Sequence, residues 1–159
     1  IFVKMRKIPL LRFADIVACA SPIGILLGRL ANFINGELVG RVADVPWAMV
    51  FPRGGSEPRH PSQIYEAALE GLLLFAVLYV LSRNEKIWNR SGTLTGIFIC
   101  GYGLARAFVE MFRQPDAQLG LLAGGATMGQ WLSAPMIVIG LFLIFRSGQE
   151  KSEGDDERA

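Results

Sequence analysis

Long apolar blocks alternate with short polar stretches along the chain. Each block has about the 17 to 20 residues that an α-helix needs to cross the hydrocarbon core of a bilayer. We expect four spans, at about residues 13–34, 61–81, 91–112 and 128–145. The pattern therefore predicts an all-α membrane protein, a polytopic helical bundle with about four transmembrane helices in this fragment.

The polar stretches between the blocks divide the rest of the chain. Residues 38–61 are rich in Pro and Gly, which favours irregular structure, and Trp47 and Phe51 there are typical of the membrane interface. We assign residues 1–146 to a single membrane-embedded domain. Residues 147–159 are a charged cytoplasmic tail whose composition predicts disorder.

Composition excludes an ordinary soluble domain. The 159 residues are 52% hydrophobic, with a mean hydropathy of +0.37 and a net charge of +2. The charges are segregated along the chain, and we expect a lipid bilayer as partner and no nucleic acid. Cys19 and Cys100 lie inside apolar blocks without disulfide or metal-ligand spacing, so we expect no metal and no organic cofactor.

The distribution of Lys and Arg predicts the orientation in the membrane. Residues 1–12, 83–90 and 146–159 hold ten of them, and the segments 38–61 and 113–127 hold four. Because cytoplasmic loops carry the excess of basic residues, we expect the first three regions to be cytoplasmic. The remaining loops then face the outer side.

A polar cluster interrupts the end of the first predicted span. It consists of Arg29, Asn32, Asn35, Glu37 and Arg41, punctuated by glycines. Ionisable groups at membrane depth are costly and usually mark a functional site. The alternative for Arg29 alone is an interfacial position in which its guanidinium reaches the lipid phosphates.

Three polar residues recur every four positions in the third predicted span. Tyr102, Arg106 and Glu110 share one helix face, and Arg106 and Glu110 are spaced to form an ion pair. The alternative to a functional role is a structural ion pair between helices. Arg113, three residues further on, is interpreted as a possible interfacial anchor.

Two glutamates, Glu66 and Glu70, lie four residues apart near the start of the second predicted span. Carboxylates in the first turns of a helix are favoured by its dipole, and for Glu70 this structural role is preferred. Glu66 and Glu37 are alternatives for orienting arginines or accepting a proton. Gly101 and Gly103 lack the spacing of a phosphate-binding loop, so we expect them to allow close helix packing.

Arg29 and Arg106 supply two permanent positive charges near the predicted outer face. The guanidinium fork matches phosphate oxygens, and a surrounding of low dielectric constant strengthens that contact. A pocket of this kind between lipid-facing helices favours an anionic phospholipid headgroup.

Three motifs give the chain a resemblance to a known family. They are residues 28–41 (GRLANFINGELVGR), residues 60–66 (HPSQIYE), and Gly101-Tyr102-Gly103 through Arg113-Gln114-Pro115-Asp116. In this order and spacing they resemble the signature of the prolipoprotein diacylglyceryl transferases. The resemblance implies that the chain is the C-terminal portion of that architecture, with further membrane helices upstream, one of them bearing a histidine.

The resemblance also implies a reaction and a location. The family transfers the diacylglyceryl group of phosphatidylglycerol to the lipobox cysteine thiol of prolipoproteins, forming a thioether and releasing glycerol phosphate. This step of lipoprotein maturation takes place in the bacterial cytoplasmic (inner) membrane, and the site is expected toward the outer face. The reaction needs a thiolate and a stabilised phosphate leaving group.

The residues expected to carry this reaction fall into two groups. Phosphatidylglycerol is expected at Arg29, Asn32, Asn35, Glu37 and Arg106, and the catalytic candidates are Arg106, Arg29, His60, Glu110 and Tyr102. His60 is the only histidine and suits a general base, or else it has a local structural role.

Two other functions use the same arginines. One is a membrane transporter, whose site is typically near the midplane between structural repeats. The other is a non-catalytic lipid-binding subunit. The polar residues lie toward one end of the spans and the sequence shows no repeat, which favours the transferase.

Overall fold

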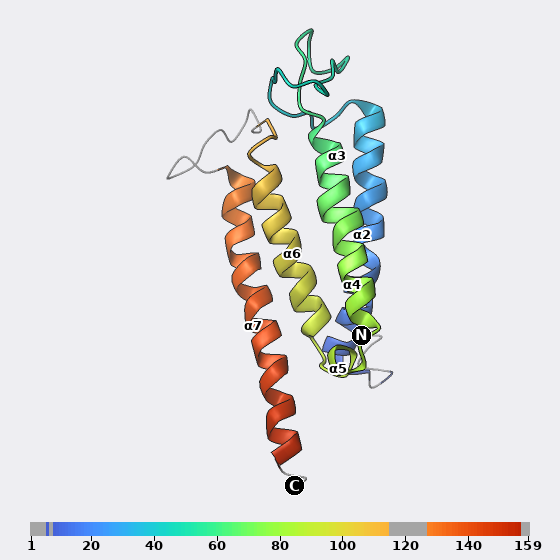
Figure 1. Cartoon of the computed structure of the whole chain (residues 1–159), viewed down its shortest axis with the longest axis vertical. Helices are drawn as coiled ribbons and strands as arrows, with labels where there is room; N and C mark the ends of the chain where they lie inside the picture. Colours follow the sequence, from blue (N-terminus) through green and yellow to red (C-terminus); the bar gives the residue numbers. More distant parts are fainter. Residues whose placement is uncertain (1–5, 7, 115–126, 157–159) are drawn as a thin grey trace.

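The computed structural model describes residue 6, residues 8–114 and residues 127–156, with side chains as far as residue 148. These residues form helices and three isolated β-bridges, without a strand. Figure 1 shows the long helices side by side. The helices are α2 (Leu10–Asn35), α3 (Ser62–Glu66), the π-helix η1 (Ala67–Leu73), α4 (Leu74–Ser82), α5 (Glu85–Trp88), α6 (Thr93–Val109) and α7 (Met128–Asp156).

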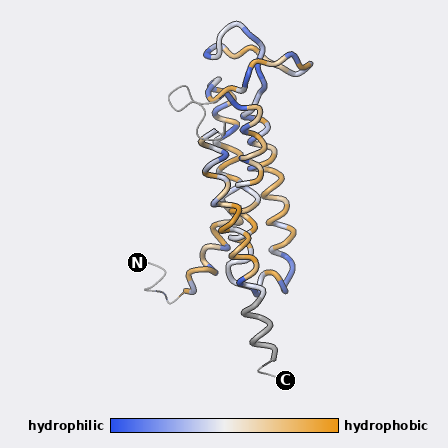
Figure 2. The backbone as a smooth tube through the Cα atoms, turned by 90° about the vertical axis from the view of Figure 1, so that its left-hand side faces the viewer, coloured by the Kyte–Doolittle hydropathy of each residue, from blue (hydrophilic) through white to orange (hydrophobic). Residues whose placement is uncertain are grey.

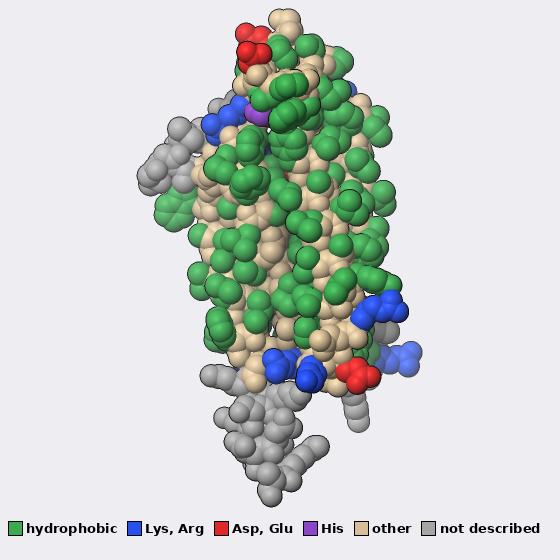
Figure 3. Space-filling view, in the orientation of Figure 1, with side chains coloured by type: hydrophobic (Ala, Val, Ile, Leu, Met, Phe, Trp, Pro, Cys, Tyr) green, Lys and Arg blue, Asp and Glu red, His purple; other side chains and the backbone are tan. Residues whose placement is uncertain are grey.

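Three of the helical segments are long and apolar enough to cross a membrane. They are Leu10–Asn35, Ser62–Ser82 (α3, η1 and α4 in succession) and Met128–Gly148, while Thr93–Val109 is a shorter apolar helix. Figure 2 shows hydrophobic residues along most of these helices, and Figure 3 shows hydrophobic side chains over the flank of the bundle. The prediction of a polytopic helical membrane protein is confirmed.

The helix bounds differ from the prediction by three residues or more in three places, the first of which is α2, which begins at Leu10 rather than at residue 13. The third span has 17 residues and ends at Val109, before the predicted end at 112. Conversely, α7 continues past 145 to Asp156, into the tail that its composition predicts to be disordered. Extending an existing helix adds one hydrogen bond for each residue fixed, and the Glu and Lys of the tail favour helix. Lys4, Lys7, Pro115, Asp116 and residues 157–159 lie outside the described residues.

Small residues bring α6 and α7 into close contact. A Cβ atom on Gly140 would lie 2.6 Å from the backbone nitrogen of Cys100, and one on Gly96 would lie 2.7 Å from the carbonyl oxygen of Gly140. A Cβ atom on Gly103 would lie 3.1 Å from the carbonyl oxygen of Ser133 on α7. Glycines let two membrane helices approach to backbone contact, as predicted for Gly103.

On the other side, α3, η1 and α4 pack between α2 and α6. A Cβ atom on Gly71 would lie 2.8 Å from the Cβ atom of Leu26 on α2, and one on Gly101 would lie 2.8 Å from a methyl group of Leu74 on α4. Pro22, a predicted kink position, lies buried within a continuous α2. The close contact at Gly71 places the π-turn η1 directly against α2.

A buried aspartate fixes the start of α6 against α2. Asp15 is 1% exposed. Its Oδ2 accepts a hydrogen bond of 2.7 Å from the backbone N–H of Gly92, and its Oδ1 accepts bonds from the N–H (2.8 Å) and hydroxyl (2.7 Å) of Thr95. The first N–H groups of a helix lack intrahelical partners, so this carboxylate caps α6 from a neighbouring helix.

The connection between α2 and α3 covers one end of the bundle, the upper end in Figure 1. The N–H of Gly40 bonds to the carbonyl of His60 at 3.1 Å, and the N–H of Arg41 bonds to the carbonyl of Phe112 at 2.9 Å. The three sequence motifs therefore meet at the same end of the molecule.

Candidate functional site

Two buried glutamates lie at the centre of an ion-pair network in the interior of the bundle. The side chain of Glu66, at the end of α3, is 0% exposed. Its Oε1 lies 2.6 Å from Nη1 of Arg106 and 3.1 Å from Nη1 of Arg113, and its Oε2 lies 3.3 Å from Nη1 of Arg29. A single carboxylate thus joins arginines from α2, from α6 and from just beyond α6.

Glu70 is the second centre of the network, one turn further along in η1. Its Oε2 accepts a hydrogen bond of 3.1 Å from Nη2 of Arg29, and its Oε1 lies 3.9 Å from Arg106. Glu110 completes the set, since its Oε2 lies 2.9 Å from Nη2 of Arg106. The predicted i,i+4 pair is therefore confirmed.

We call these six residues the arginine–glutamate cluster: Arg29, Glu66, Glu70, Arg106, Glu110 and Arg113. With every group ionised, its three arginines and three glutamates carry no net charge. Buried ions need close partners, because removing them from water is costly. The pairing of all six side chains explains how so many charged groups remain inside an apolar bundle.

The cluster is accessible at its arginines and closed at its central carboxylates. The side chains of Arg29 and Arg106 are 17% and 16% exposed, whereas Glu66 and Glu70 are fully buried. Tyr102 lies close enough to Arg29 for an electrostatic interaction. The accessible part of the cluster therefore belongs mainly to positively charged side chains, so the arrangement suits an anion.

The hydrogen bonding of the cluster is incomplete. Oε2 of Glu66, Oε1 of Glu70 and Oε2 of Glu110 lie within ion-pair distance of a guanidinium but accept no hydrogen bond from the described residues. Buried acceptors are normally satisfied, and exceptions often belong to functional sites. Each of these oxygens keeps acceptor capacity that the described residues do not use.

Local structure explains why the two glutamates face inward. A π-turn is frequent at functional sites, and η1 carries Glu70. The start of α3 is tied to the preceding loop, because the hydroxyl of Ser62 donates to the carbonyl of Leu38 (3.0 Å) and Nε2 of Gln63 donates to that of Glu37 (2.6 Å). These bonds hold α3 so that Glu66 points between α2 and α6.

The structure brings together four of the predicted residues: Arg29, Tyr102, Arg106 and Glu110. It corrects the interpretation of Arg113 as an interfacial anchor, because this side chain is buried and contacts Glu66. Glu70 contacts arginines, so its placement goes beyond the dipole role that the sequence favoured. The sequence feature that could have indicated this role for both glutamates is the spacing of Glu66 and Glu70 on an apolar helix.

The other four predicted residues lie away from these ion pairs. Asn32 is half-buried one turn beyond Arg29, and Asn35 is exposed. The carboxylate of Glu37 is exposed and lies 2.6 Å from Nη1 of Arg53. Nδ1 of His60 lies 3.1 Å from the hydroxyl of Tyr65, outside the cluster.

No metal site is evident in the part of the chain that the structure describes: it contains no group of three His, Cys, Asp or Glu side chains suited to an ion. Both cysteines are free thiols; Cys100 is buried and Cys19 is half-buried.

Comparison with known proteins gives one family. The family model described as prolipoprotein diacylglyceryl transferase matches residues 1–146. The phosphatidylglycerol–prolipoprotein diacylglyceryl transferase of Allorhizobium ampelinum is 57% identical over 148 residues, which are 92% of this chain and 52% of the relative. Proteins of the same name from Paramagnetospirillum magneticum and Idiomarina loihiensis are 59% and 51% identical, over 90% and 97% of this chain and 54% and 57% of the relatives.

The chain spans about half the length of these curated relatives. The expectation that it corresponds to their C-terminal half is not confirmed, because the shared lengths give the extent of the match and not its position.

Proposed function

Because the chain belongs to the prolipoprotein diacylglyceryl transferase family, we propose that the protein transfers the diacylglyceryl group of phosphatidylglycerol to the lipobox cysteine thiol of prolipoproteins. The observation that carries the proposal is the arginine–glutamate cluster. Its two partly accessible guanidiniums, held by buried carboxylates, suit an anionic headgroup inside an apolar bundle.

In the proposed reaction the thiolate sulfur of the precursor attacks the glyceryl carbon next to the phosphate. The carbon–sulfur bond forms as the carbon–oxygen bond breaks, and glycerol phosphate leaves with the electron pair. Arg29 and Arg106 bind the phosphate and stabilise the charge that develops on its oxygen. Such preorganised stabilisation is usually the largest single contribution to catalysis.

The buried glutamates have two roles in this proposal. They hold the two guanidinium groups in place, so that little conformational entropy is lost in ordering these groups when the substrate binds. The carboxylate oxygens that accept no hydrogen bond also provide acceptors for headgroup hydroxyls or for the thiol proton. Glu110 and Glu66 are the candidates for the proton, and Tyr102 supports Arg29.

The residues outside the cluster are assigned to the rim of the site. Asn32, Asn35 and Glu37 follow Arg29 toward the loop end of the bundle, where a headgroup would enter. His60 is separated from the cluster and hydrogen-bonded to Tyr65, so we assign the proton to the carboxylates rather than to His60.

We place the protein in the bacterial cytoplasmic membrane, with the loop end of the bundle on the outer side. The support is the count of basic residues, which is higher in the regions at the other end. Its partners in this proposal are the bilayer, phosphatidylglycerol and precursors with a lipobox cysteine. Residues 1–146 act as one domain.

The experiment follows glycerol phosphate release by the full-length protein in liposomes with phosphatidylglycerol and a lipobox peptide. Release with the Cys peptide and none with a matched Cys→Ser peptide is the expected result. Headgroup binding without release would overturn the proposal in favour of a lipid-binding subunit. Movement of an anionic solute across the liposome membrane without release would favour a transporter.

A further inference from the structure

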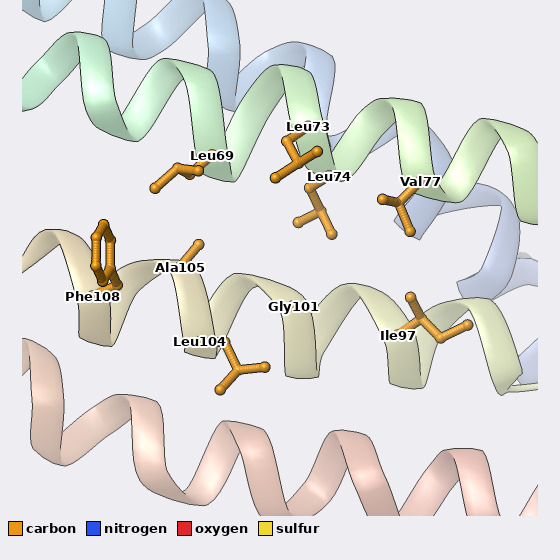
Figure 4. A pocket seen from close by; sticks show the side chains of 9 residues that line it. All are labelled: Leu69, Leu73, Leu74, Val77, Ile97, Gly101, Leu104, Ala105 and Phe108. Carbon is orange, nitrogen blue, oxygen red and sulfur yellow. The ribbon is translucent and has the colours of Figure 1, made fainter.

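The helix α6 has different neighbours on its two sides. Toward η1 and α4 it borders an apolar hollow of about 390 Å³, and Figure 4 shows the side chains that line it, among them Leu73, Val77 and Ile97. None of the six residues of the arginine–glutamate cluster lines this hollow. On the other side of α6 lies α7, and its residue Gly129 lies against the carboxylate of Glu110.

Gly129, the second residue of α7, leaves free the space that the Glu110 carboxylate occupies. A Cβ atom on Gly129 would lie 2.5 Å from Oε2 of Glu110, 2.7 Å from its Cδ and 3.1 Å from its Oε1. Ordinary van der Waals contacts begin at about 3.4 Å. The whole carboxylate group is therefore closer to α7 than any side chain at position 129 would permit.

The carboxylate lies between the start of α7 and one arginine. Its Oε2 is 2.9 Å from Nη2 of Arg106, and the Glu110 side chain is only 6% exposed. The Cα–Cβ direction of a helical residue is tilted toward the N-terminus of its helix, so the Cβ position of Gly129 points to the positive end of the α7 dipole. The guanidinium group and the start of α7 both favour a negative charge at this place.

Hydrogen bonds fix the first turn of α7 around Gly129. The N–H of Thr127 bonds to Oε1 of Gln130 (3.2 Å), and the N–H of Gln130 bonds to the hydroxyl of Thr127 (3.4 Å), which is a reciprocal helix cap. The hydroxyl of Ser133, a residue 1% exposed, donates to the carbonyl of Gly129 at 2.7 Å. Because this backbone is held in place, a side chain added at position 129 displaces the flexible end of Glu110.

Gly129 differs in this respect from Gly140, further along α7. A Cβ atom on Gly140 would meet the backbone nitrogen of Cys100, which cannot move unless the two helices separate. At Gly129 the atoms that a Cβ would meet belong to the end of a side chain. An alanine at position 140 should therefore cost stability, whereas an alanine at position 129 should mainly move a carboxylate.

We propose that Gly129 is a positioning residue of the site, because the absence of a side chain there lets α7 hold Glu110 against Arg106. The carboxylate oxygen held in this way, Oε2, accepts no hydrogen bond from the described residues. The proposal rests on the proposed function for the reaction in which Glu110 takes part. It gives a role in the site to α7, which contributes none of the six residues of the arginine–glutamate cluster.

The first experiment compares Gly129→Ala with Gly148→Ala in the full-length protein, by cysteine-dependent glycerol phosphate release in liposomes. Nothing lies within 4 Å of the Cβ position of Gly148, on the same helix. Gly129→Ala should lower kcat by about 10- to 100-fold, because it displaces the carboxylate by about 1 Å. Since Glu66 still holds Arg106, the KM for phosphatidylglycerol should change by less than about twofold. Gly148→Ala should match the unsubstituted protein.

Thermal unfolding in detergent separates positioning from packing. Gly129→Ala should unfold close to the unsubstituted protein, whereas Gly140→Ala should unfold at a lower temperature. A normal kcat for Gly129→Ala, with or without a change in KM, would overturn the proposal. So would a loss of stability equal to that of Gly140→Ala, because the contact at Gly129 would then be one between rigid parts of the two helices.

The second experiment tests whether the effect of Gly129→Ala depends on Glu110. Glu110→Asp draws the carboxylate back by one methylene group and vacates the space beside Gly129. In the Glu110→Asp background we expect Gly129→Ala to lower kcat by less than about twofold, since coupled residues are not additive. An equal loss in both backgrounds would mean that position 129 affects the site without Glu110, and the proposal would be wrong.

The third measurement does not depend on transfer. The full-length protein is labelled with ¹⁵N-arginine, and the side-chain signal of Arg106 is identified by its loss in Arg106→Lys. Gly129→Ala should shift this signal in the same direction as Glu110→Gln does, and Gly148→Ala should leave it in place. An Arg106 signal unaffected by Gly129→Ala would contradict the proposal. If the unsubstituted protein released no glycerol phosphate, the proposed function would fail, and the Arg106 signal would still decide the role of Gly129.

Discussion

The carboxylate of Glu66 accepts a hydrogen bond of 2.6 Å from Arg106, which lies forty positions further along the chain. This contact joins the end of α3 to α6 inside the bundle. Arg106 then reaches Glu110 with its other terminal nitrogen. Both terminal nitrogens of the guanidinium are therefore in ion pairs, and its orientation is fixed before any substrate arrives.

We expect Arg106→Ala to abolish transfer, with a loss of about 100-fold or more, because the charge that stabilises the phosphate is removed. Arg106→Lys keeps the charge and loses the fork that spans Glu66 and Glu110, so it should retain only a small part of the activity. The measurement is cysteine-dependent glycerol phosphate release, normalised to the amount of inserted protein. An Arg106→Ala variant with normal release would exclude a catalytic role.

Glu66→Gln should destabilise the protein more than Glu70→Gln. Glu66 lies within 3.3 Å of three arginines, whereas Glu70 makes one contact at 3.1 Å and one at 3.9 Å. Breaking a buried ion pair typically costs about 3–5 kcal/mol. Thermal unfolding in detergent compares the two variants, and equal losses would show that the cluster does not depend on Glu66 as its centre.

Asp15→Ala should lower the free energy of unfolding by about 2 kcal/mol, because it removes the buried acceptor for the first N–H groups of α6. Thr95→Val is the matched control, since it removes only the hydroxyl bond and keeps both backbone bonds. We expect about half the loss for this variant. An unchanged unfolding transition in Asp15→Ala would mean that water caps α6 equally well.

Gly140→Ala should destabilise the contact between α6 and α7. Its new Cβ atom would lie 2.6 Å from the backbone nitrogen of Cys100, so the helices must separate, at a typical cost of about 1–3 kcal/mol. Gly24→Ala is the control, because nothing lies within 4 Å of that Cβ position and the substitution favours helix. The same unfolding assay measures both, and similar transitions would argue against backbone contact at Gly140.

The proposed orientation predicts which loops a membrane-impermeant maleimide can reach. Ser56→Cys, in the loop that covers α2 and α3, should react in intact cells, and Asn84→Cys, between α4 and α5, should react only after permeabilisation. Both side chains are exposed, so burial does not bias the comparison. The reverse pattern would invert the assignment of the two membrane faces.

The spans and the pair Arg106–Glu110 were predictable because both depend on local spacing. The length of an apolar block can be read directly from the sequence. Helix geometry places residues i and i+4 on the same face, so their pairing follows from their spacing. The predicted helix bounds were less accurate. The helix α7 continues beyond its apolar block, because a helix continues as long as its backbone hydrogen bonds do, whatever the hydropathy of its residues.

The central position of Glu66 and Glu70 was not predictable from spacing, because their partners come from α2 and α6. From its position, Glu70 was assigned the local role at a helix start, and Glu66 was left as an alternative for orienting arginines or accepting a proton. The π-turn that carries Glu70 has no clear sequence signal. Arg113 was interpreted as an interfacial anchor for the same reason. Asp15 received no role, since its partners, Gly92 and Thr95, are more than seventy positions away.

The balance of charge in the arginine–glutamate cluster has an electrical consequence. Moving one elementary charge across the whole membrane changes its electrostatic free energy by about 2.3 kcal/mol for every 100 mV of transmembrane potential. With every group ionised, the three arginines and three glutamates of the cluster cancel that work, so a change of membrane voltage exerts no net force on the cluster. Loss of one arginine leaves an uncompensated negative charge, and the site then becomes sensitive to the voltage of the cell.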